Sequence, residues 1–394
     1  MRLIFIDMHC INFLGKTWSM IKSGSKIATF KHRFIVDYAL SHNIEVCNYI
    51  TGESTEIKRY GRFITRDKWH IGSKIEHQKV MQENFGDKWK KIKIVSKDDI
   101  RKDDIVIGYL YKWYQLEVMK SLPCIKIVMF NHFVSINNEL NLNNYKINAF
   151  INEIDLSDNQ FVNKYIRREK IKQIVCPFIF ANRFHNKNGN RKNKLLAIGT
   201  LSTCKGNSGY KLYREYFGTE WIQLSRKMIF DSADKYKEDI DSFISYIFED
   251  KKEIYDTDSF FVKIYKKMKN RYTPWTQSKY TSFDMVDKFN EYKMFVCPEE
   301  LVGMPGIGFV EGMACGTAYL GLDTAYYRKL GLIPGKHYIS YDGSMKDLLK
   351  KIRYYEMHKD ELARIAENGE LFVRGNFNEK AVAERFFTAL QNLY

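Results

Sequence analysis

The residues best suited to chemistry lie in one stretch, from Met294 to Asp323, where carboxylates surround a glycine-rich loop. Glycines at positions 303, 306 and 308 let backbone amides come close to a ligand, because no Cβ stands in the way. A short helix is expected to begin after this loop, and the unpaired amides at the start of a helix attract anions. Glu311 lies just inside that helix; since a carboxylate would repel a phosphate, we expect it to accept hydrogen bonds from sugar hydroxyls. A tight turn in a parallel sheet, with Glu311 as a capping side chain, would fit the same residues.

Two short apolar runs position this loop. Met294–Cys297 is long enough only for a buried strand, and Pro298 ends it. The helix expected over Phe309–Cys315 stops at Gly316, which serves as a left-handed cap, and Ala318–Leu322 returns as a second strand. Strand, loop, helix and strand make a βαβ unit, in which a ligand binds beyond the carboxyl end of the strand.

The segment GIGFVEGMACGTAYLGLD resembles the nucleotide-sugar site of GT-B glycosyltransferases, especially of the glycosyl transferases of group 1. Residues 311–317 match the second half of that family's motif. The family's first glutamate would stand at Gly303, whereas Glu299 and Glu300 lie further upstream. This longer spacing is more similar to that of fucosyltransferase-type GT-B enzymes. The match at Glu311 implies a retaining transferase, and an inverting, fucosyltransferase-like enzyme stays open as the alternative.

A second match opens the C-terminal half, where an expected strand is followed by Gly199, Thr200 and Lys205. Lys205 falls on the lysine with which group 1 enzymes meet the donor diphosphate, and Thr200 stands where they have an arginine. A cation here would stabilise the charge that builds on a diphosphate leaving group. A surface lysine in an ordinary loop would give the same pattern. The candidates to replace the family's arginine are Arg226, Lys227 and Arg271.

The N-terminal half offers two histidines, each directly after an expected strand and so at the edge of the sheet where ligands bind. His9 follows the first expected strand and shares its loop with Gly15 and Lys16, which gives three acceptor-side candidates. His132 follows the expected strand Cys124–Phe130, and group 1 enzymes often carry a histidine at the place that it resembles. A single histidine is more often structural than catalytic.

Residues 207–293 depart from the group 1 pattern. We expect helices there over Lys235–Glu249 and Phe260–Lys269, and the family's usual middle strands are not recognisable. Asp256-Thr257-Asp258 has the form that holds a metal in GT-A transferases. Such a triplet arises by chance in a chain rich in Asp, so no metal site is expected there.

Together the matches imply an α/β protein of the GT-B fold, with two Rossmann-like domains facing each other across a cleft. Residues 1–182 would bind the acceptor, residues 183–376 the donor, and residues 377–394 would form a terminal helix that crosses back onto the first domain.

The implied reaction is that of a hexosyltransferase: a sugar passes from a nucleotide-sugar to a glycan or lipid-linked acceptor, as in the synthesis of bacterial lipopolysaccharide or capsule. No metal or other cofactor is expected. The catalytic candidates are His132, Glu300 and Glu311, and the donor-binding candidates are Gly199, Thr200, Lys205, Glu299, Gly306, Ile307, Gly308, Phe309 and Glu311.

Composition limits the partners. The chain has 394 residues, a net charge of +16 and 45% hydrophobic residues, which is enough for two domains with buried cores. No apolar run is long enough to span a membrane, and the 7 cysteines form no close pair. The charge fits an anionic donor and an anionic membrane surface, while nucleic-acid signatures are missing.

We expect a cytoplasmic enzyme, free or peripheral at the inner face of the membrane. The acidic, glycine-rich signature of a nucleotide-sugar epimerase is not found; a basic RNA- or membrane-binding protein stays open as the non-enzymatic alternative.

Overall fold

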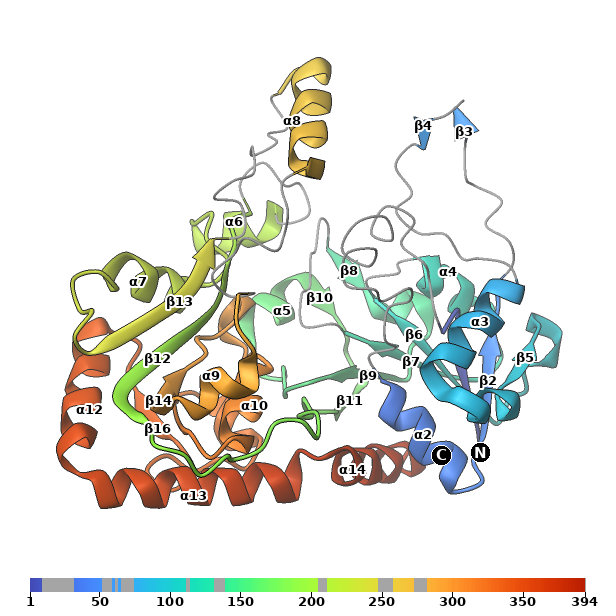
Figure 1. Cartoon of the computed structure of the whole chain (residues 1–394). Helices are drawn as coiled ribbons and strands as arrows, with labels where there is room; N and C mark the ends of the chain where they lie inside the picture. Colours follow the sequence, from blue (N-terminus) through green and yellow to red (C-terminus); the bar gives the residue numbers. More distant parts are fainter. Residues whose placement is uncertain are drawn as a thin grey trace.

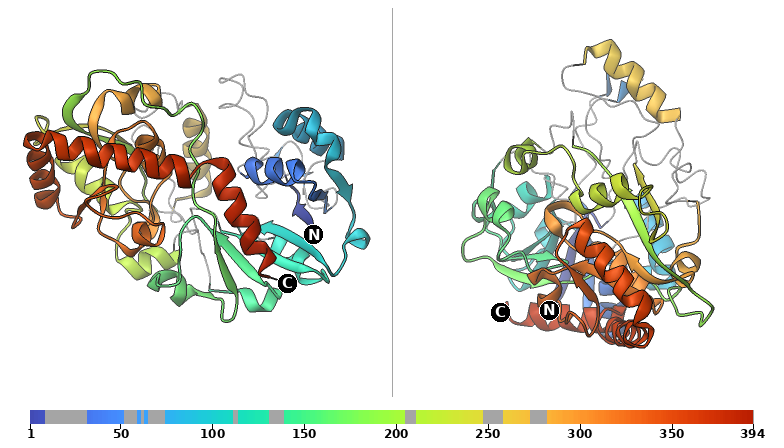
Figure 2. Two further views of the ribbon diagram at one scale, coloured as in Figure 1. Left: turned by 90° about the horizontal axis from the view of Figure 1, so that it is seen from below. Right: turned by 90° about the vertical axis from the view of Figure 1, so that its left-hand side faces the viewer.

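Two parallel sheets, one after the other along the chain, form the framework of the protein (Figure 1). Helices lie against both sheets, and a long pair of C-terminal helices runs beneath the two (Figures 1 and 2). The computed structural model describes residues 1–8, 32–51, 59–60, 63–64, 74–110, 114–130, 139–204, 211–246, 258–272 and 282–393.

The first sheet has its strands in the order β11–β9–β7–β6–β1–β2–β5, all parallel. This is the Rossmann order with a further strand at one edge. Leu3 and Phe5 belong to the apolar cluster on one face and Ile4 and Ile6 to the cluster on the other, because side chains alternate along a strand. The strands are β1 (Arg2–Ile6), β2 (Glu45–Tyr49), β5 (Lys93–Val95), β6 (Asp104–Tyr109), β7 (Ile125–Met129), β9 (Ala149–Asn152) and β11 (Lys172–Val175).

The second sheet has its strands in the order β13–β12–β14–β15–β16, again all parallel. This is the flavodoxin-like order, in which the second strand of the chain flanks the first. Leu196 and Ile198 pack on one face and Leu195 and Ala197 on the other. The strands are β12 (Lys192–Leu201), β13 (Ile240–Tyr246), β14 (Tyr292–Val296), β15 (Ala318–Leu322) and β16 (Ile339–Tyr341).

The helices and the small strands complete the two domains. Short pairs of strands, β3 (Arg59–Tyr60) with β4 (Phe63–Ile64) and β8 (Leu140–Asn141) with β10 (Ile166–Arg167), stand apart from the main sheets. The α-helices are α2 (Arg33–Ser41), α3 (Lys74–Phe85), α4 (Tyr114–Lys120), α5 (Gln160–Tyr165), α6 (Lys211–Phe217), α7 (Leu224–Ser232), α8 (Phe260–Tyr272), α9 (Met285–Asn290), α10 (Gly308–Ala314), α11 (Ala325–Lys329), α12 (Met345–Met357), α13 (Lys359–Asn376) and α14 (Glu379–Gln391).

The last two helices tie the domains together. α13 lies along the second domain, and α14 continues onto the first (Figures 1 and 2). Val382, Phe386 and Leu390, spaced one helical turn apart on α14, belong to the same apolar cluster as Leu3 and Ile35 of the first domain. The prediction that the final helix crosses back onto the first domain is confirmed.

The carboxyl ends of the two sheets face each other. Phe130, directly after β7, shares an apolar cluster with Leu301 and Met304, which follow β14 in the other domain. Nearby, the Asn159 Nδ2 atom of the first domain donates a hydrogen bond to the Tyr326 hydroxyl of the second, at 2.7 Å. Ligand sites of open parallel sheets lie outside these strand ends, so both domains contribute to one interdomain region.

One predicted helix is wrong. Where the sequence pattern indicates a helix over Lys235–Glu249, the structure has the strand β13, which pairs with β12 from Leu195↔Ile240 to Leu201↔Tyr246. The apolar residues Ile240, Phe243 and Ile244 recur at a spacing that also suits a helix, and pairing with a distant strand decides the outcome. The second strand of the donor-side sheet is therefore present, although its sequence differs from the group 1 pattern.

The other predicted elements agree with the structure to within a few residues. The helix expected over Phe260–Lys269 is α8, and the strand–helix–strand unit around the glycine-rich loop is β14–α10–β15. Gly316 ends α10 with a φ of 70°, as the cap requires. Within the described ranges, no helix combines the length and apolar character needed to cross a bilayer.

Candidate active site

The predicted donor residues meet where the order of the second sheet reverses, between β12 and β14. Gly199 and Thr200 lie near the end of β12, and Glu299 and Glu300 follow its neighbour β14. Such a reversal point leaves a crevice beyond the strand ends, because the loops on either side lead away in opposite directions. Two pairs of adjacent residues that are far apart in the sequence, 199–200 and 299–300, are thus brought to one edge of the sheet.

The centre of this edge is a buried arginine, Arg226, which α7 inserts between the two strand ends. Its Nε atom donates to the Pro298 carbonyl at 2.9 Å and its Nη1 atom to the Thr200 carbonyl at 2.8 Å. Its Nη2 atom forms an ion pair with the Glu300 carboxylate, and the side chain is only 3% exposed. Arg226 is one of the three cations considered for the family's missing arginine, and the structure brings it to Thr200, the position where that arginine would stand.

Gly199 makes room for this guanidinium. Its φ is 148°, and a Cβ added there would lie 2.9 Å from Arg226 Nε. A side chain at position 199 would therefore displace the arginine as well as strain the backbone. The predicted donor residue Gly199 acts through this close approach.

Glu300, predicted as catalytic, has both carboxylate oxygens engaged. Oε1 pairs with Arg226, and Oε2 accepts a hydrogen bond from Gln223 Nε2 at 3.2 Å. Gln223 in turn accepts a hydrogen bond from the Ser202 amide at 2.9 Å. Glu300 thus belongs to a network that fixes the ends of β12, α7 and β14, which is the geometry of a positioning residue.

Glu299, predicted as a donor contact, turns into the domain. Its Oε1 atom accepts hydrogen bonds from the Leu322 amide and the Tyr327 hydroxyl, both at 3.0 Å. The side chain is buried, and burial raises the pKa of this carboxyl above its ordinary value. Tyr327 also shares a hydrogen bond of 2.5 Å with the Tyr319 hydroxyl. Glu299 therefore joins the end of β14 to the end of β15.

The glycine-rich loop passes over the ion pair of Arg226 and Glu300. A Cβ added to Gly306 would lie 3.3 Å from Glu300 Oε1 and 3.5 Å from Arg226 Nη2. A Cβ on Gly308, the first residue of α10, would lie 2.5 Å from Cys297 Sγ. Both glycines thus allow the backbone to lie close to protein side chains, and their predicted contact with a donor stays a prediction.

The two apolar residues of the loop differ in what they can offer a ligand. Ile307 is 44% exposed, so its side chain lies open at the start of α10. Phe309 is buried in the core, with its ring against those of Tyr319, Tyr327 and Phe377. Of the predicted donor residue Phe309, only the backbone is available.

Glu311 is a glutamate of this region whose carboxyl has a raised pKa. It lies in the first turn of α10, and burial raises the pKa of its carboxyl to about 7, while Arg183 acts to lower it. No hydrogen bond to its carboxylate is formed within the described part of the chain. A half-buried carboxyl that titrates near neutral pH beside a glycine-rich loop can accept hydrogen bonds from a ligand's hydroxyls.

Five predicted residues lie outside the described residues: His9, Gly15, Lys16, His132 and Lys205. Their flanking strands are described and end at the interdomain edge, as the sequence predicts. What the structure establishes at these ends is the position of the neighbours, Met8, Phe130 and Cys204, all of which are buried.

The sequence pattern missed one buried polar residue of the first domain. Asp7, directly after β1, accepts hydrogen bonds from the Thr51 amide at 3.0 Å and the Thr51 hydroxyl at 2.7 Å. Its Oδ1 atom lies 4.0 Å from His77 Nε2. An acidic residue right after a buried strand is the signal that could have found it, because a carboxylate is rarely buried there without partners. Asp7 fixes the ends of β1 and β2 in the first domain.

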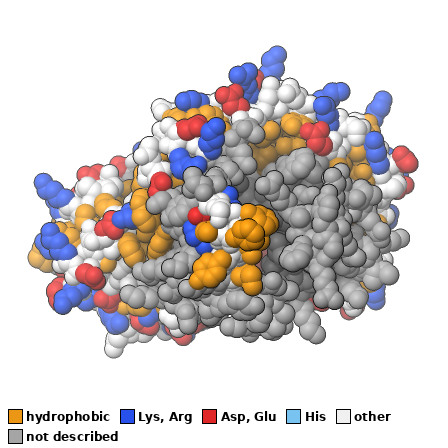
Figure 3. Space-filling view, turned by 90° about the horizontal axis from the view of Figure 1, so that it is seen from above, with side chains coloured by type: hydrophobic (Ala, Val, Ile, Leu, Met, Phe, Trp, Pro, Cys, Tyr) orange, Lys and Arg blue, Asp and Glu red, His pale blue; other side chains and the backbone are white. Residues whose placement is uncertain are grey.

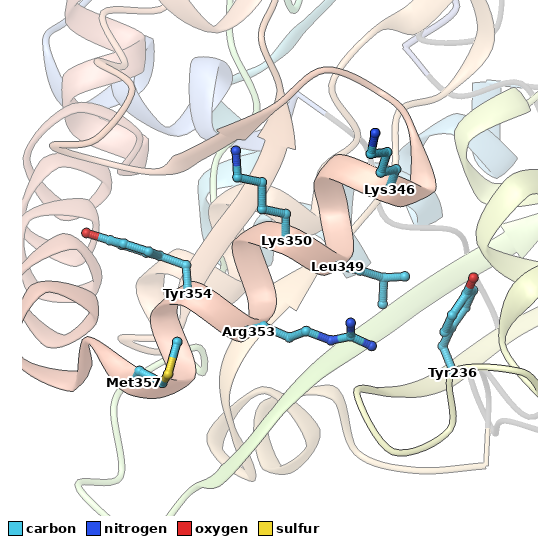
Figure 4. A pocket seen from close by; sticks show the side chains of 7 residues that line it. All are labelled: Tyr236, Lys346, Leu349, Lys350, Arg353, Tyr354 and Met357. Atoms are coloured by element: carbon cyan, nitrogen blue, oxygen red, sulfur yellow. The ribbon is translucent and has the colours of Figure 1, made fainter.

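Neither Asp258 nor a surface pocket beside α12 adds a predicted ligand site. The Asp258 carboxylate pairs with Lys266 Nζ at 2.8 Å, so it is neutralised within the chain. Among the described residues no cluster of His, Cys, Asp and Glu could hold a metal. A pocket beside α12 contains no predicted site residue (Figure 4). It is lined by Tyr236, Lys346, Leu349, Lys350, Arg353, Tyr354 and Met357.

Comparisons with known proteins bear on the fold and on the C-terminal part of the chain. A family model described as glycosyl transferase-like matches residues 262–388, the segment from α8 to α14. HepE of Anabaena in complex with UDP-glucose superposes with a TM-score of 0.53 and 9% identity over 100% of both chains. A glycosyltransferase of Rickettsia africae gives a TM-score of 0.49 and 11% identity over 100% of this chain and 98% of that one. No curated relative matches the sequence.

The fold and the family match together define the class. The protein has the GT-B fold, since its similarity to HepE extends over both chains in full. Residues 262–388 match a glycosyl transferase-like family model, and the prediction of an enzyme similar to the glycosyltransferases of group 1 is confirmed.

Proposed function

We propose that this glycosyltransferase moves a sugar from a nucleotide-sugar to a glycan or lipid-linked acceptor, in the synthesis of a bacterial surface polysaccharide. The observation that carries the proposal is the glycine-rich loop at the β12–β14 reversal point, with Glu311 directly after it. HepE, which shares the fold, is a protein whose structure contains UDP-glucose. We assign the donor to residues 183–376 and the acceptor to residues 1–182.

The donor's two parts make different demands on this site. The diphosphate requires backbone amides and cations, which the glycine-rich loop and Lys205 would supply without a metal. The sugar and ribose hydroxyls require an acceptor, and Glu311 is a carboxylate to which the described residues form no hydrogen bond. Arg226 would contribute by fixing the Thr200 carbonyl and the loop, since Glu300 balances its charge.

We propose the acceptor-binding residues from their positions at the carboxyl ends of strands, as for the donor. His9, Gly15, Lys16 and His132 come after strands of the first sheet, whose carboxyl ends face the donor loop. A lipid-linked acceptor would be presented at the inner face of the cytoplasmic membrane. The net charge of +16 supports peripheral attachment to such an anionic surface.

A panel of nucleotide-sugars tests the proposal directly. We expect UDP- or GDP-sugars to raise the melting temperature and single-stranded RNA to leave it unchanged, since ligands that bind the folded state stabilise it. Glu311→Gln should abolish most of the shift with the intact donor, whereas Glu367→Gln, an exposed glutamate on α13, should leave it intact. A shift with RNA and none with any nucleotide-sugar would refute a transferase.

A further inference from the structure

The helix α8, Phe260–Tyr272, carries an apolar face that the molecule does not cover. Phe260 is 71% exposed, Phe261 79%, Tyr265 59% and Met268 57%. On a helix these positions fall on one side, since they are separated by one, four and three residues. Figure 1 shows the whole helix projecting from the second domain.

The charged side of α8 is less exposed than its apolar side. Lys266, on the opposite side of the helix, is the partly buried residue, with its side chain 18% exposed and its ammonium group paired with Asp258. An amphipathic helix normally turns its apolar side towards the core and its charged side towards water. Here the Lys266 side pairs with Asp258, two residues before the helix, and it is the apolar side that is exposed to the surroundings.

The charge around this face identifies the partner. From Ser259 to Phe283 the sequence contains Lys and Arg but no Asp or Glu. A helix with aromatic residues on one side and lysines on the other matches an interfacial helix, which buries its rings among acyl chains while its cations meet anionic headgroups. A protein partner with an ordinary mixed surface would not require acids to be missing over the whole segment.

The first domain has a matching element at the same end. The β3–β4 pair projects upwards at the same end of the molecule as α8 in Figure 1, separated from it across the width of the view. Its sequence from Arg59 to Ile64, RYGRFI, is again aromatic and basic without an acid. Figure 3, which looks onto this end, shows hydrophobic side chains gathered at the surface with lysines and arginines nearby.

We propose that α8 docks this protein on an anionic phospholipid bilayer, with Phe260, Phe261, Tyr265 and Met268 inserted between the headgroups. The inference deepens the membrane partner of the proposed function by naming the surface that binds it. Docking at this end would bring both domains towards the membrane, because β3–β4 and α8 belong to different domains. An acceptor carried by a lipid would then be met by both at once.

Vesicle sedimentation tests the proposal. Wild type is expected to bind vesicles that contain phosphatidylglycerol and to bind pure phosphatidylcholine vesicles weakly. The double variant Phe260→Ser/Phe261→Ser should bind the anionic vesicles at least roughly tenfold more weakly, since two inserted aromatic rings are lost. The matched control is Met357→Ser/Leu371→Ser, which removes two exposed apolar residues from α12 and α13 at the opposite end of the molecule.

Vesicle binding and nucleotide-sugar binding are measured separately, so failure of the membrane proposal can be told from failure of the proposed function. The thermal shift with a nucleotide-sugar, measured without vesicles, should be the same for wild type and the α8 variant; a loss of vesicle binding with this shift retained supports the proposal. Equal vesicle binding by wild type and the α8 variant would overturn it, as would an equal loss in the control. A wild-type dimer in gel filtration that the α8 variant abolishes, with vesicle binding unchanged, would instead assign the face to a second copy of the chain.

Discussion

Arg226 and Glu300 form a buried ion pair that holds together the ends of two neighbouring strands. The guanidinium also binds the carbonyls of Thr200 and Pro298, one from each strand end, so a single side chain joins β12, α7 and β14. The glycine-rich loop passes directly over this pair. The shape of the candidate site therefore depends on a charge that a ligand itself need not touch.

Breaking the ion pair of Arg226 and Glu300 should lower the free energy of unfolding. We expect Arg226→Ala and Glu300→Ala each to lower the free energy of unfolding by roughly 3–5 kcal/mol, because each leaves an uncompensated buried charge. The double variant should lose less than the sum of the two, since the partners are coupled. Urea denaturation measures all three.

A neighbouring pair provides the control. Lys227 pairs with Asp231 at a more exposed place on the same helix, so Lys227→Ala should cost no more than about 1 kcal/mol. If Glu300→Gln left stability unchanged but abolished turnover, Glu300 would be a catalytic group and not a positioning residue.

The pKa of Glu311 predicts that donor affinity depends on pH. Burial raises it from about 4.5 to about 7 in the free protein, so below pH 7 the carboxyl is protonated and accepts hydrogen bonds poorly. Binding to hydroxyls favours the carboxylate. The affinity for a nucleotide-sugar should therefore rise with pH until about 7 and then level off, falling by up to roughly tenfold per pH unit below that value. Titration calorimetry from pH 5.5 to 8.5 measures it.

The same shift has the opposite effect on stability. The folded state binds the Glu311 proton more tightly than the unfolded state, so this group stabilises the fold fully below pH 4.5 and loses its contribution as pH rises through 7. In the absence of ligand, Glu311→Gln should thus be at least as stable as wild type at pH 8. Its donor binding should be weaker by roughly 1–3 kcal/mol, as for a lost charged hydrogen bond. A variant that is both unstable at pH 8 and normal in donor binding would assign Glu311 to the fold alone.

Elements bounded by nearby Pro and Gly residues could be predicted from the sequence, whereas an element that depends on pairing with a distant strand could not. Pro298 and Gly316 delimit β14 and α10 through their own backbone preferences, so the sequence places this unit to within two residues. The strand β13 was taken for a helix because its identity depends on pairing with β12, more than forty residues away. Short-range patterns contain no information about that pairing.

The candidate site shows the same division. The place of Glu311 after the glycine loop follows from adjacent residues, and the structure agrees with it. The partners of Arg226 lie 26 and 74 positions away, so its choice over Lys227 could not be read from the sequence. A cue existed nonetheless: Arg226 and Ile229 lie one turn apart on the buried side of α7, where an arginine without a partner would be costly.

Activity is expected to survive EDTA. The carboxylate most suited to a metal by sequence, Asp258, is neutralised by Lys266, and in this fold helix amides and cations can balance the diphosphate. Product formation before and after chelation, with Asp258→Asn in parallel, measures it. Full loss of activity that Mn²⁺ restores would reinstate Asp256 and Asp258 as metal ligands.

The stereochemistry is expected to be retention, and the anomeric proton signal of the product reports it by NMR. An inverting transferase needs a general base within hydrogen-bond reach of the acceptor hydroxyl, whereas a retaining one can return the proton to the leaving diphosphate. Glu300 is held by Arg226 and Gln223, and Glu299 by Tyr327 and the Leu322 amide, so neither upstream glutamate has the freedom of a base. Of the predicted catalytic residues, His132, which follows β7 in the sequence, is the one whose variant distinguishes the two mechanisms. With retention, His132→Ala should slow transfer while donor hydrolysis persists in part and nucleoside diphosphate binding stays unchanged. An inverted product, together with a His132→Ala enzyme that fails only in transfer, would make His132 the base and the mechanism inverting.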